Sequence, residues 1–290
     1  MPNQHVPAPR HGELMLVATP IGNLSDLSPR ACETLAGADL IACEDTRTTR
    51  TLLAAHGIAT RTVALHAHNE RAASDKLLEA LLAGSRIALV SDAGTPAVSD
   101  PGALLVAAAH AAGVRVSTVP GPNAAIAAYA ASGFLADRFL FAGFLPAAAA
   151  ARRKVLAELD AGCPLILYEA PHRVLAAVED LIAAYGTERE IVFARELTKK
   201  FEEVSRMRLA DGPAWLAAHA HRQQGEFVLV LGPRPPVAPQ EDTESERVLG
   251  ILLAELPVSA AARAAARITG ASKNALYARA LALAEKSDEA

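Results

Sequence analysis

Small, polar and rigid residues interrupt an apolar run near position 90. The run Ile87–Val90 is followed by Ser91-Asp92-Ala93-Gly94-Thr95-Pro96-Ala97-Val98-Ser99-Asp100-Pro101-Gly102. The two glycines permit close backbone approach or a positive φ, whereas the two prolines fix φ. Open α/β sheets bind small molecules at the carboxyl ends of buried strands. Two Ser-Asp pairs around Gly-Thr-Pro exceed what a plain strand-to-helix turn needs, so we predict a ligand-binding loop with two carboxylate acceptors.

Two further polar segments follow apolar runs. His66, His68, Asn69 and Glu70 offer donor atoms of mixed type without a distant partner at metal-ligand spacing, so we expect no metal. The segment Glu44-Asp45-Thr46-Arg47 has two interpretations. Asp45 or Thr46 caps a helix, or Arg47 contacts a phosphate and Asp45 orients it.

The spacing of apolar residues predicts α/β order along most of the chain. The predicted strands of a first domain, residues 12–120, are Leu14–Ala18, Leu40–Cys43, Thr62–Leu65, Ile87–Val90 and Val114–Val119. A second domain, residues 121–232, is predicted to contain helices Asn123–Ala131, Arg152–Leu159 and Arg173–Tyr185 and strands Phe139–Gly143, Leu165–Tyr168, Ile191–Ala194 and Phe227–Leu231.

A proline-rich and acidic segment, residues 233–245, reads as a linker to a helical tail, residues 246–286. Helices Ser259–Ile268 and Asn274–Leu283, with Gly270 between them, have helix-turn-helix spacing. The charged residues from position 257 to 284 are all basic: Arg263, Arg267, Lys273 and Arg279. The tail is either a helical cap on a neighbouring domain or an anchor for RNA or the ribosome.

Composition argues against a membrane-spanning, secreted or disulfide-bonded protein. The 290 residues are 51% hydrophobic, yet no apolar run approaches the ~20 residues that span a bilayer. The N-terminus lacks a signal-peptide pattern, and Cys32, Cys43 and Cys163 lack disulfide or ligand spacing. We expect a soluble cytoplasmic protein. Because the net charge is −4, binding of nucleic acid must depend on local basic patches.

The glycine pattern argues against a Rossmann dehydrogenase and against a P-loop nucleotide-binding fold. The first strand leads into Thr19-Pro20-Ile21-Gly22-Asn23 rather than G-x-G-x-x-G, and the chain has no P-loop lysine motif. Loops 19–23, 92–102, 120–123 and 143–146 are instead expected to line one cleft for a small ligand with few charges.

Nine motifs in order carry a family resemblance. They are A-T-P-I-G-N-L-S-D (18–26), C-E-D-T-R (43–47), H-N-E (68–70), S-D-A-G-T-P-A-V-S-D-P-G (91–102), P-G-P-N-A (120–124), F-A-G-F-L-P (141–146), Y-E-A-P-H-R (168–173), A-R-E-L-T-K (194–199) and G-E-F-V-L-V (225–230). Over residues 14–231 the chain resembles the ribosomal RNA small-subunit methyltransferase I (RsmI) family of the tetrapyrrole-methylase superfamily.

The resemblance implies S-adenosylmethionine bound in a cleft between two α/β domains, usually in a homodimer. The implied reaction is 2′-O-methylation of a cytidine ribose in the decoding region of 16S rRNA, in the small ribosomal subunit. The cofactor-binding residues that it implies are Pro20, Asp92, Gly94, Thr95, Pro96, Ser99, Gly121, Asn123, Ala124, Gly143, Phe144 and Leu145. Taken alone, Gly121 suits a plain helix entry equally well, and an aromatic such as Phe144 is more often core than cofactor wall.

Charged and aromatic residues at other strand ends are candidates for contacts with the RNA and for catalysis. We expect RNA contacts from Arg47, His68, Asn69, Arg152, Arg153, Tyr168, Arg173, Lys199 and Lys200. The sequence does not identify a general base, and the catalytic candidates are Glu70, Arg195, Glu196 and Lys199. The family usually has a lysine soon after F-L-P and Arg-Gly after F-E-E, where this chain has alanines and Arg206-Met207. Neither departure lies in the cofactor loops, so both affect only the expected contacts with the RNA.

Two other functions stay open at this point. A tetrapyrrole methyltransferase on the same fold would lack Arg195, Lys199 and the basic tail. A regulator that binds nucleic acid through the tail would leave the H-N-E and R-E-L-T-K motifs unexplained.

Overall fold

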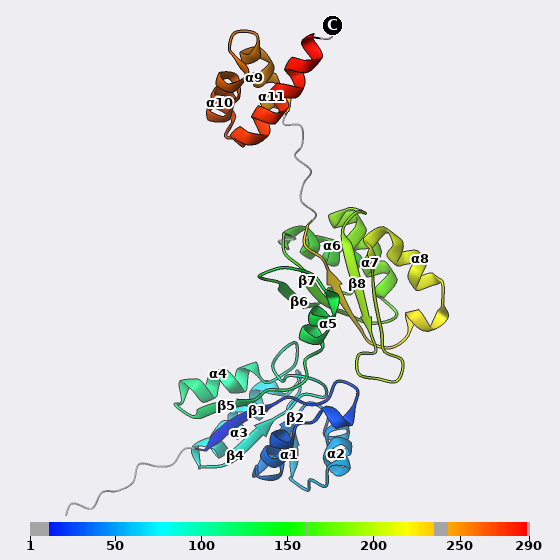
Figure 1. The fold of residues 1–290 in the computed structure, drawn as a ribbon. Helices are drawn as coiled ribbons and strands as arrows, with labels where there is room; N and C mark the ends of the chain where they lie inside the picture. Colours follow the sequence, from blue (N-terminus) through cyan, green and yellow to red (C-terminus); the bar gives the residue numbers. More distant parts are fainter. Residues whose placement is uncertain (1–11, 160–161, 235–242, 289–290) are drawn as a thin grey trace, which may run out of the picture. The chain divides into compact units, whose positions relative to one another are not determined.

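The structure, a computed structural model, describes residues 12–159, 162–234 and 243–288. The chain divides into two compact units, one up to Arg234 and one from Pro235 onward. The first unit contains two sheets, which we call the first and second lobes, and the second unit is helical (Figure 1).

The first lobe is a parallel sheet with helices on both faces. Its strands are β1 (Glu13–Val17), β2 (Leu40–Cys43), β3 (Thr62–Ala64), β4 (Arg86–Leu89) and β5 (Arg115–Val119), in the order β3-β2-β4-β1-β5. The helices are α1 (Pro29–Ala36), α2 (Thr46–Ala55), α3 (Glu70–Leu82) and α4 (Ala103–Ala111). Alternate residues of β1 enter opposite cores: Met15 and Val17 pack with α1 and α2, and Leu14 and Leu16 with α3 and α4.

The second lobe is a mixed sheet. Its strands are β6 (Leu140–Phe144), β7 (Leu165–Glu169), β8 (Glu190–Arg195), β9 (Glu203–Arg208) and β10 (Phe227–Leu231), in the order β6-β7-β10-β8-β9. Only β6 and β7 pair in parallel among these strands. One face packs on α6 (Ala149–Glu158), α7 (Val174–Tyr185) and α8 (Gly212–Ala217), and the other on α5 (Ala124–Ser132).

Most predicted elements agree with the structure to within a few residues, and β2 and β10 agree at both ends. The sequence analysis missed β9 and α8. Every second residue of β9 is exposed, and its charged sequence, EVSRMR, lacks the apolar run by which the other strands were recognised. It is an edge strand of the sheet, where charged side chains are common.

The helical unit contains α9 (Thr243–Leu253), α10 (Val258–Thr269) and α11 (Lys273–Asp288). Its core comprises Val248, Leu249, Ala261, Ala262, Ala265, Leu276 and Ala280. Gly270 ends α10 with φ +76°, a left-handed conformation that favours glycine. Most of the predicted linker, residues 235–242, lies outside the described residues.

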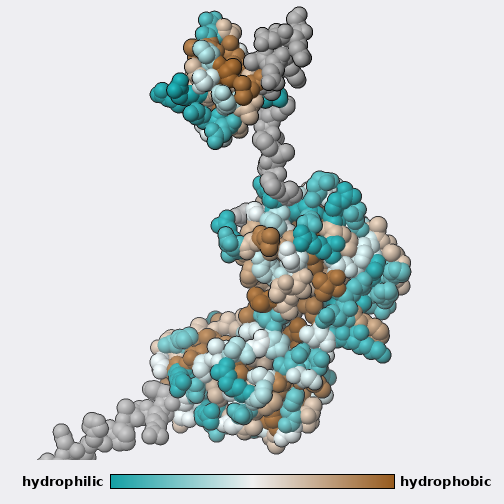
Figure 2. All heavy atoms as spheres, viewed as in Figure 1, coloured by the Kyte–Doolittle hydropathy of each residue, from teal (hydrophilic) through white to brown (hydrophobic). Residues whose placement is uncertain are grey.

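Figure 2 shows apolar patches among hydrophilic residues on the visible face of the molecule. Exposed apolar side chains of the second lobe include Ile126, Phe139 and Leu135, the last being 96% exposed. No helix in the described parts of the chain is long and apolar enough to cross a membrane. Within the same residues, no three His, Cys, Asp or Glu side chains are grouped to hold a metal ion.

Candidate active site

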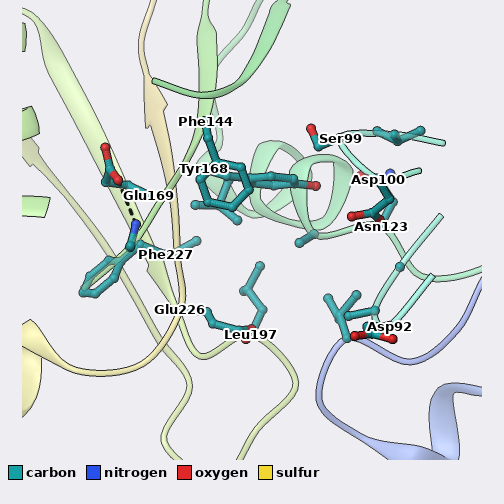
Figure 3. A pocket seen from close by; sticks show the side chains of 18 of the residues that line it. Asp92, Ser99, Asp100, Asn123, Phe144, Tyr168, Glu169, Leu197, Glu226 and Phe227 are labelled. Carbon is teal, nitrogen blue, oxygen red and sulfur yellow. Dashed lines mark hydrogen bonds between the residues drawn. The ribbon is translucent and has the colours of Figure 1, made fainter. Parts of the chain in front are cut away.

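A cavity of about 410 Å³ is lined by residues of both lobes (Figure 3). The first lobe and the start of α5 contribute Ile21, Asp92, Ala93, Gly94, Thr95, Val98, Ser99, Asp100, Asn123 and Ala124. The second lobe contributes Phe144, Tyr168, Glu169, Ala170, Pro171, Ala194, Leu197, Glu226, Phe227 and Val228. The loops of the first lobe follow the carboxyl ends of parallel strands, where a small ligand is expected.

The first half of the 91–102 loop is fixed by backbone bonds. Thr19 and Gly94 exchange two N–H to C=O bonds of 2.9 and 3.0 Å. The Thr95 hydroxyl donates to the Pro122 carbonyl at 3.2 Å. Further along, Ala97 and Ser99 have φ of +64° and +68°, conformations that cost residues with a side chain about 1–3 kcal/mol each. Strain of this kind clusters at functional sites, and Ser99 lines the cavity.

Two carboxylates, Asp92 and Asp100, line the first-lobe side of the cavity, and Glu169 and Glu226 line the second-lobe side. Burial raises the pKa of Asp100 to about 6, and the nearby charge of Glu44 adds to the effect. Burial also raises the pKa of Glu44, and Asp92 adds to that shift. Asp92 is held in place because its Oδ1 accepts the Asp45 amide at 3.0 Å. This side of the cavity is therefore suited to a cationic group.

The opposite wall is aromatic. The rings of Phe144 and Tyr168 meet edge to face with centroids 5.4 Å apart, and Phe141 supports Tyr168 at 5.1 Å. In Figure 3 Tyr168 extends from β7 toward the side that carries Ser99 and Asp100. Tyr168, which the sequence analysis assigned to RNA, is thus a wall of the cavity.

The loop after β8 reaches from the second lobe to the first. A Cβ built on Gly22 would lie 2.4 Å from Lys199 Cγ and 2.9 Å from Thr198 Oγ1, so only glycine permits this approach. Glu196 Oε1 accepts from Lys199 Nζ at 2.8 Å, and Lys199 Nζ also bonds Glu226 at 3.0 Å. Lys199 therefore sits at the cavity rim between two carboxylates.

Seven of the twelve predicted cofactor residues line the cavity: Asp92, Gly94, Thr95, Ser99, Asn123, Ala124 and Phe144. Pro20, Pro96, Gly121, Gly143 and Leu145 are not among the lining residues. Gly143 lies next to Ser99, and a Cβ at position 143 would crowd Ser99 Oγ at 3.0 Å. Leu145 is buried in the core of the second lobe.

The cofactor residues that the resemblance implied did not include three acidic lining residues, Asp100, Glu169 and Glu226. Asp100 is one of the two carboxylate acceptors predicted in the 91–102 loop, and it lines the cavity. Glu169 and Glu226 lie within the motifs Y-E-A-P-H-R and G-E-F-V-L-V, but the sequence assigned neither of them a role.

One predicted RNA contact, Arg152, and one catalytic candidate, Arg195, are buried and require correction. Arg152 is 4% exposed, and its Nε and Nη2 bond Asp180 Oδ2 at 2.7 and 2.6 Å. Arg195 is 5% exposed and donates to the carbonyls of Gln224 and Phe201. Both guanidinium groups are occupied inside the protein, so neither is available to a phosphate or to the reacting atoms in this structure.

Other predicted residues have mixed environments. Asp45 caps α2 and also pairs with Arg47 at 2.7 Å, so the capping interpretation is confirmed. The Arg47 side chain is 87% exposed, and its contact with a phosphate stays a prediction. Arg153, Lys200 and His68 are exposed. Asn69 bonds the His66 amide and the Ala64 carbonyl.

Arg173 and Glu70 make contacts within the protein. Arg173 pairs with Glu169 at 3.1 Å and also donates to the Leu145 carbonyl. The Glu70 carboxylate bonds the backbone at the start of α4.

Comparisons with known proteins give consistent matches. Residues 13–212 match the family model of tetrapyrrole (corrin/porphyrin) methylases, and residues 239–284 match the RsmI C-terminal HTH domain. A ribosomal RNA small subunit methyltransferase I from Pseudomonas aeruginosa is 48% identical over 279 residues, 95% of this chain and 99% of the relative. The protein of that name from Escherichia coli O157:H7 is 47% identical, over 93% of this chain and 95% of the relative.

Solved structures share the fold. Uroporphyrin-III-C-methyltransferase from Thermus thermophilus aligns with a TM-score of 0.54 and 21% identity, over 76% of this chain and 94% of that one. Diphthine synthase aligns with a TM-score of 0.57 and 17% identity, over 76% of this chain and 89% of that one. The predicted fold, two α/β domains of the tetrapyrrole-methylase type with a helical tail, is confirmed.

Proposed function

Because the chain belongs to the ribosomal RNA small subunit methyltransferase I family of the tetrapyrrole methylases, we propose that it methylates 16S rRNA with S-adenosylmethionine. The proposed acceptor is the 2′-oxygen of a cytidine ribose in the decoding region. The observation that carries the proposal is the cavity between the 91–102 loop and the aromatic wall.

The residues of the cavity fit S-adenosylmethionine. The volume of the cavity lies within the ~300–1,000 Å³ typical of small-molecule sites. The cofactor has an ammonium and a sulfonium cation, for which Asp92 and Asp100 offer carboxylates. Phe144, Tyr168 and Leu197 offer apolar surface to its adenosine part.

The protein mainly has to position the reactants. When bound, S-adenosylmethionine would supply an electrophilic methyl group: its bond to sulfur would break as the bond to the ribose 2′-oxygen forms, leaving a neutral thioether, and the hydroxyl proton would be lost to solvent or to a base. The strained 91–102 loop and the aromatic wall fix the donor and exclude water from it. We propose that Lys199, held between Glu196 and Glu226, orders the rim where the ribose enters.

Exposed cations outside the cavity are suited to the RNA backbone. Arg47, Arg153 and Lys200 are exposed in the first unit, and Arg263, Arg267 and Lys273 are exposed in the helical unit. Phosphate contacts of this kind supply affinity without base specificity. We propose that the helical unit anchors the small ribosomal subunit. We also propose a homodimer, in which a second copy covers the exposed apolar side chains of Ile126, Leu135 and Phe139. The proposed location is the cytoplasm.

The test is methyl transfer from labelled S-adenosylmethionine to 30S particles, naked 16S rRNA and uroporphyrinogen. We expect label in 30S particles, recovered as 2′-O-methylcytidine after nuclease digestion. Label in the tetrapyrrole alone, or on a base rather than a ribose, would overturn the proposal.

Gly94→Val provides an inactive control for this assay. Gly94 has φ +84°, which a β-branched residue adopts only with strain, and its side chain would project at the cavity. We expect cofactor binding to fall at least tenfold in calorimetric titration while the circular dichroism spectrum stays unchanged. Unchanged affinity would remove this position from the site.

A further inference from the structure

Glu70 makes an unusual long-range contact at the edge of the proposed active site. It is the first residue of α3, and its Oε1 accepts the amide of Gly102 at 2.8 Å and that of Leu104 at 3.3 Å. Glu70 is not among the residues that line the cavity. The carboxylate that the sequence offered as a candidate base is thus bonded to the backbone where the 91–102 loop ends.

The start of α4 needs a cap from elsewhere in the chain. Its N-cap residue is Gly102, which has no side chain to accept the first amides of the helix. A side chain cannot be added, because φ is +125° and a Cβ would lie 2.7 Å from Leu89 Cδ2. Glu70 supplies the missing acceptor, and its negative charge is favourable at a helix N-terminus.

This cap fixes the end of a strained segment. Thr19 and Pro122 hold the first half of the loop through Gly94 and Thr95. The second half contains Ala97 and Ser99 with positive φ, and such conformations persist only where surrounding contacts enforce them. Ser99 and Asp100, in this half, line the cavity. A contact at Gly102 therefore restrains the residues that face the ligand.

We propose that Glu70 is a positioning residue, which holds residues 96–102 in the form that binds the cofactor, and that it is not the general base. The inference rests on the proposed function, since the cofactor is taken to be S-adenosylmethionine. Loss of the contact lowers the fraction of molecules with a competent loop, and the apparent affinity falls by the same factor.

Two substitutions separate positioning from base catalysis. Glu70→Gln keeps a carbonyl oxygen for the two amides but cannot accept a proton, whereas Glu70→Ala removes the acceptor. We expect Glu70→Ala to raise the Kd and KM for S-adenosylmethionine about tenfold, with kcat at saturating cofactor within about threefold of wild type. Glu70→Gln should stay within about threefold of wild type in all three constants.

The opposite result would identify a base. Loss of a general base lowers kcat by ~10²- to 10⁴-fold, so a Gln variant with intact cofactor affinity and such a loss would overturn the proposal. Wild-type affinity in Glu70→Ala would overturn it as well. The matched control is Glu79→Ala, an exposed acid on the same helix, which should leave all constants unchanged.

Hydrogen exchange provides a readout that does not depend on the cofactor. The amides of Gly102 and Leu104 should exchange faster in Glu70→Ala than in wild type, and Glu70→Gln should restore their protection. If wild-type protein binds no S-adenosylmethionine, the proposed function fails, whereas unchanged exchange in Glu70→Ala contradicts the role of Glu70 itself.

Discussion

Asp100 should make cofactor affinity depend on pH between about 5 and 7. Burial, with the charge of Glu44, raises its pKa to about 6 in the protein without ligand. If the cationic cofactor binds only the carboxylate form, the Kd is multiplied by one plus the ratio of protonated to ionised Asp100. With a pKa of about 6, the Kd is about tenfold higher at pH 5, about twofold higher at pH 6 and nearly unchanged at pH 7.

Calorimetric titration of S-adenosylmethionine at pH 5, 6, 7 and 8 checks this expectation in wild type and Asp100→Asn. The variant should bind more weakly at pH 7, and its Kd should stay flat across the window. Circular dichroism at each pH shows that the protein remains folded. A flat wild-type Kd would refute the reasoning, and a slope retained in the variant would assign the titration to another group, such as Glu44.

The raised pKa of Asp100 predicts that ionisation of this carboxyl lowers the stability of the protein, although it strengthens cofactor binding. Its folded-state pKa, about 6, lies above the ordinary value of 3.8, so the folded protein binds this proton more tightly than the unfolded chain. The contribution of Asp100 to stability is therefore lost as pH rises from about 4 to about 6. Asp100→Asn should raise the Tm at pH 7 while it weakens cofactor binding. A lower Tm in the variant would contradict the raised pKa.

Neighbouring arginines on α6 and the helical unit provide further tests. Arg152→Ala leaves the buried Asp180 carboxylate without its main partner and should lower the free energy of unfolding by about 3 kcal/mol in denaturant titration. Arg153→Ala removes only a longer, exposed contact with Asp180 at 3.7 Å, so it should change the free energy of unfolding by less than about 1 kcal/mol. It should reduce the salt dependence of RNA binding by ~0.7 to 0.9 in log-log slope; equal effects of the two variants would contradict their assignment. Truncation after Pro239 should leave a folded, cofactor-binding protein, because the helical unit is a separate compact body. The KM for 30S particles should rise more than kcat falls, whereas a lower Tm would make the tail a structural cap, and an unchanged KM would exclude the anchor.

Residue type and local pattern predicted much of the fold. The strand Leu40–Cys43 was predicted at both ends because a parallel strand covered on both faces is a continuous apolar run. The 91–102 loop was predicted because glycine, proline and acids follow such a run. The antiparallel pairing of β10 between β7 and β8 left no local signal, since strand order depends on contacts between distant segments.

The charged residues show where a single sequence is insufficient. Arg152 and Arg153 are adjacent and identical, yet Arg152 is buried against Asp180, 28 residues later, whereas the exposed Arg153 reaches the same carboxylate only at 3.7 Å. Arginine is rarely buried, so exposure was the reasonable expectation for both. Glu70 likewise has the right chemistry for a base, but its partner amides lie 32 and 34 residues away. Their roles depend on tertiary contacts.

The position of β10 has a consequence for synthesis of the chain. This strand, the last of the first unit, lies in the middle of the second sheet. The first lobe is complete in sequence by Val119 and can fold while the rest is being translated. The second lobe must wait for Phe227–Leu231, and until then β7 and β8 each present an unpaired edge. Nascent chains that stop before Leu231 should therefore carry an aggregation-prone half-sheet, and those that extend to Arg234 should not.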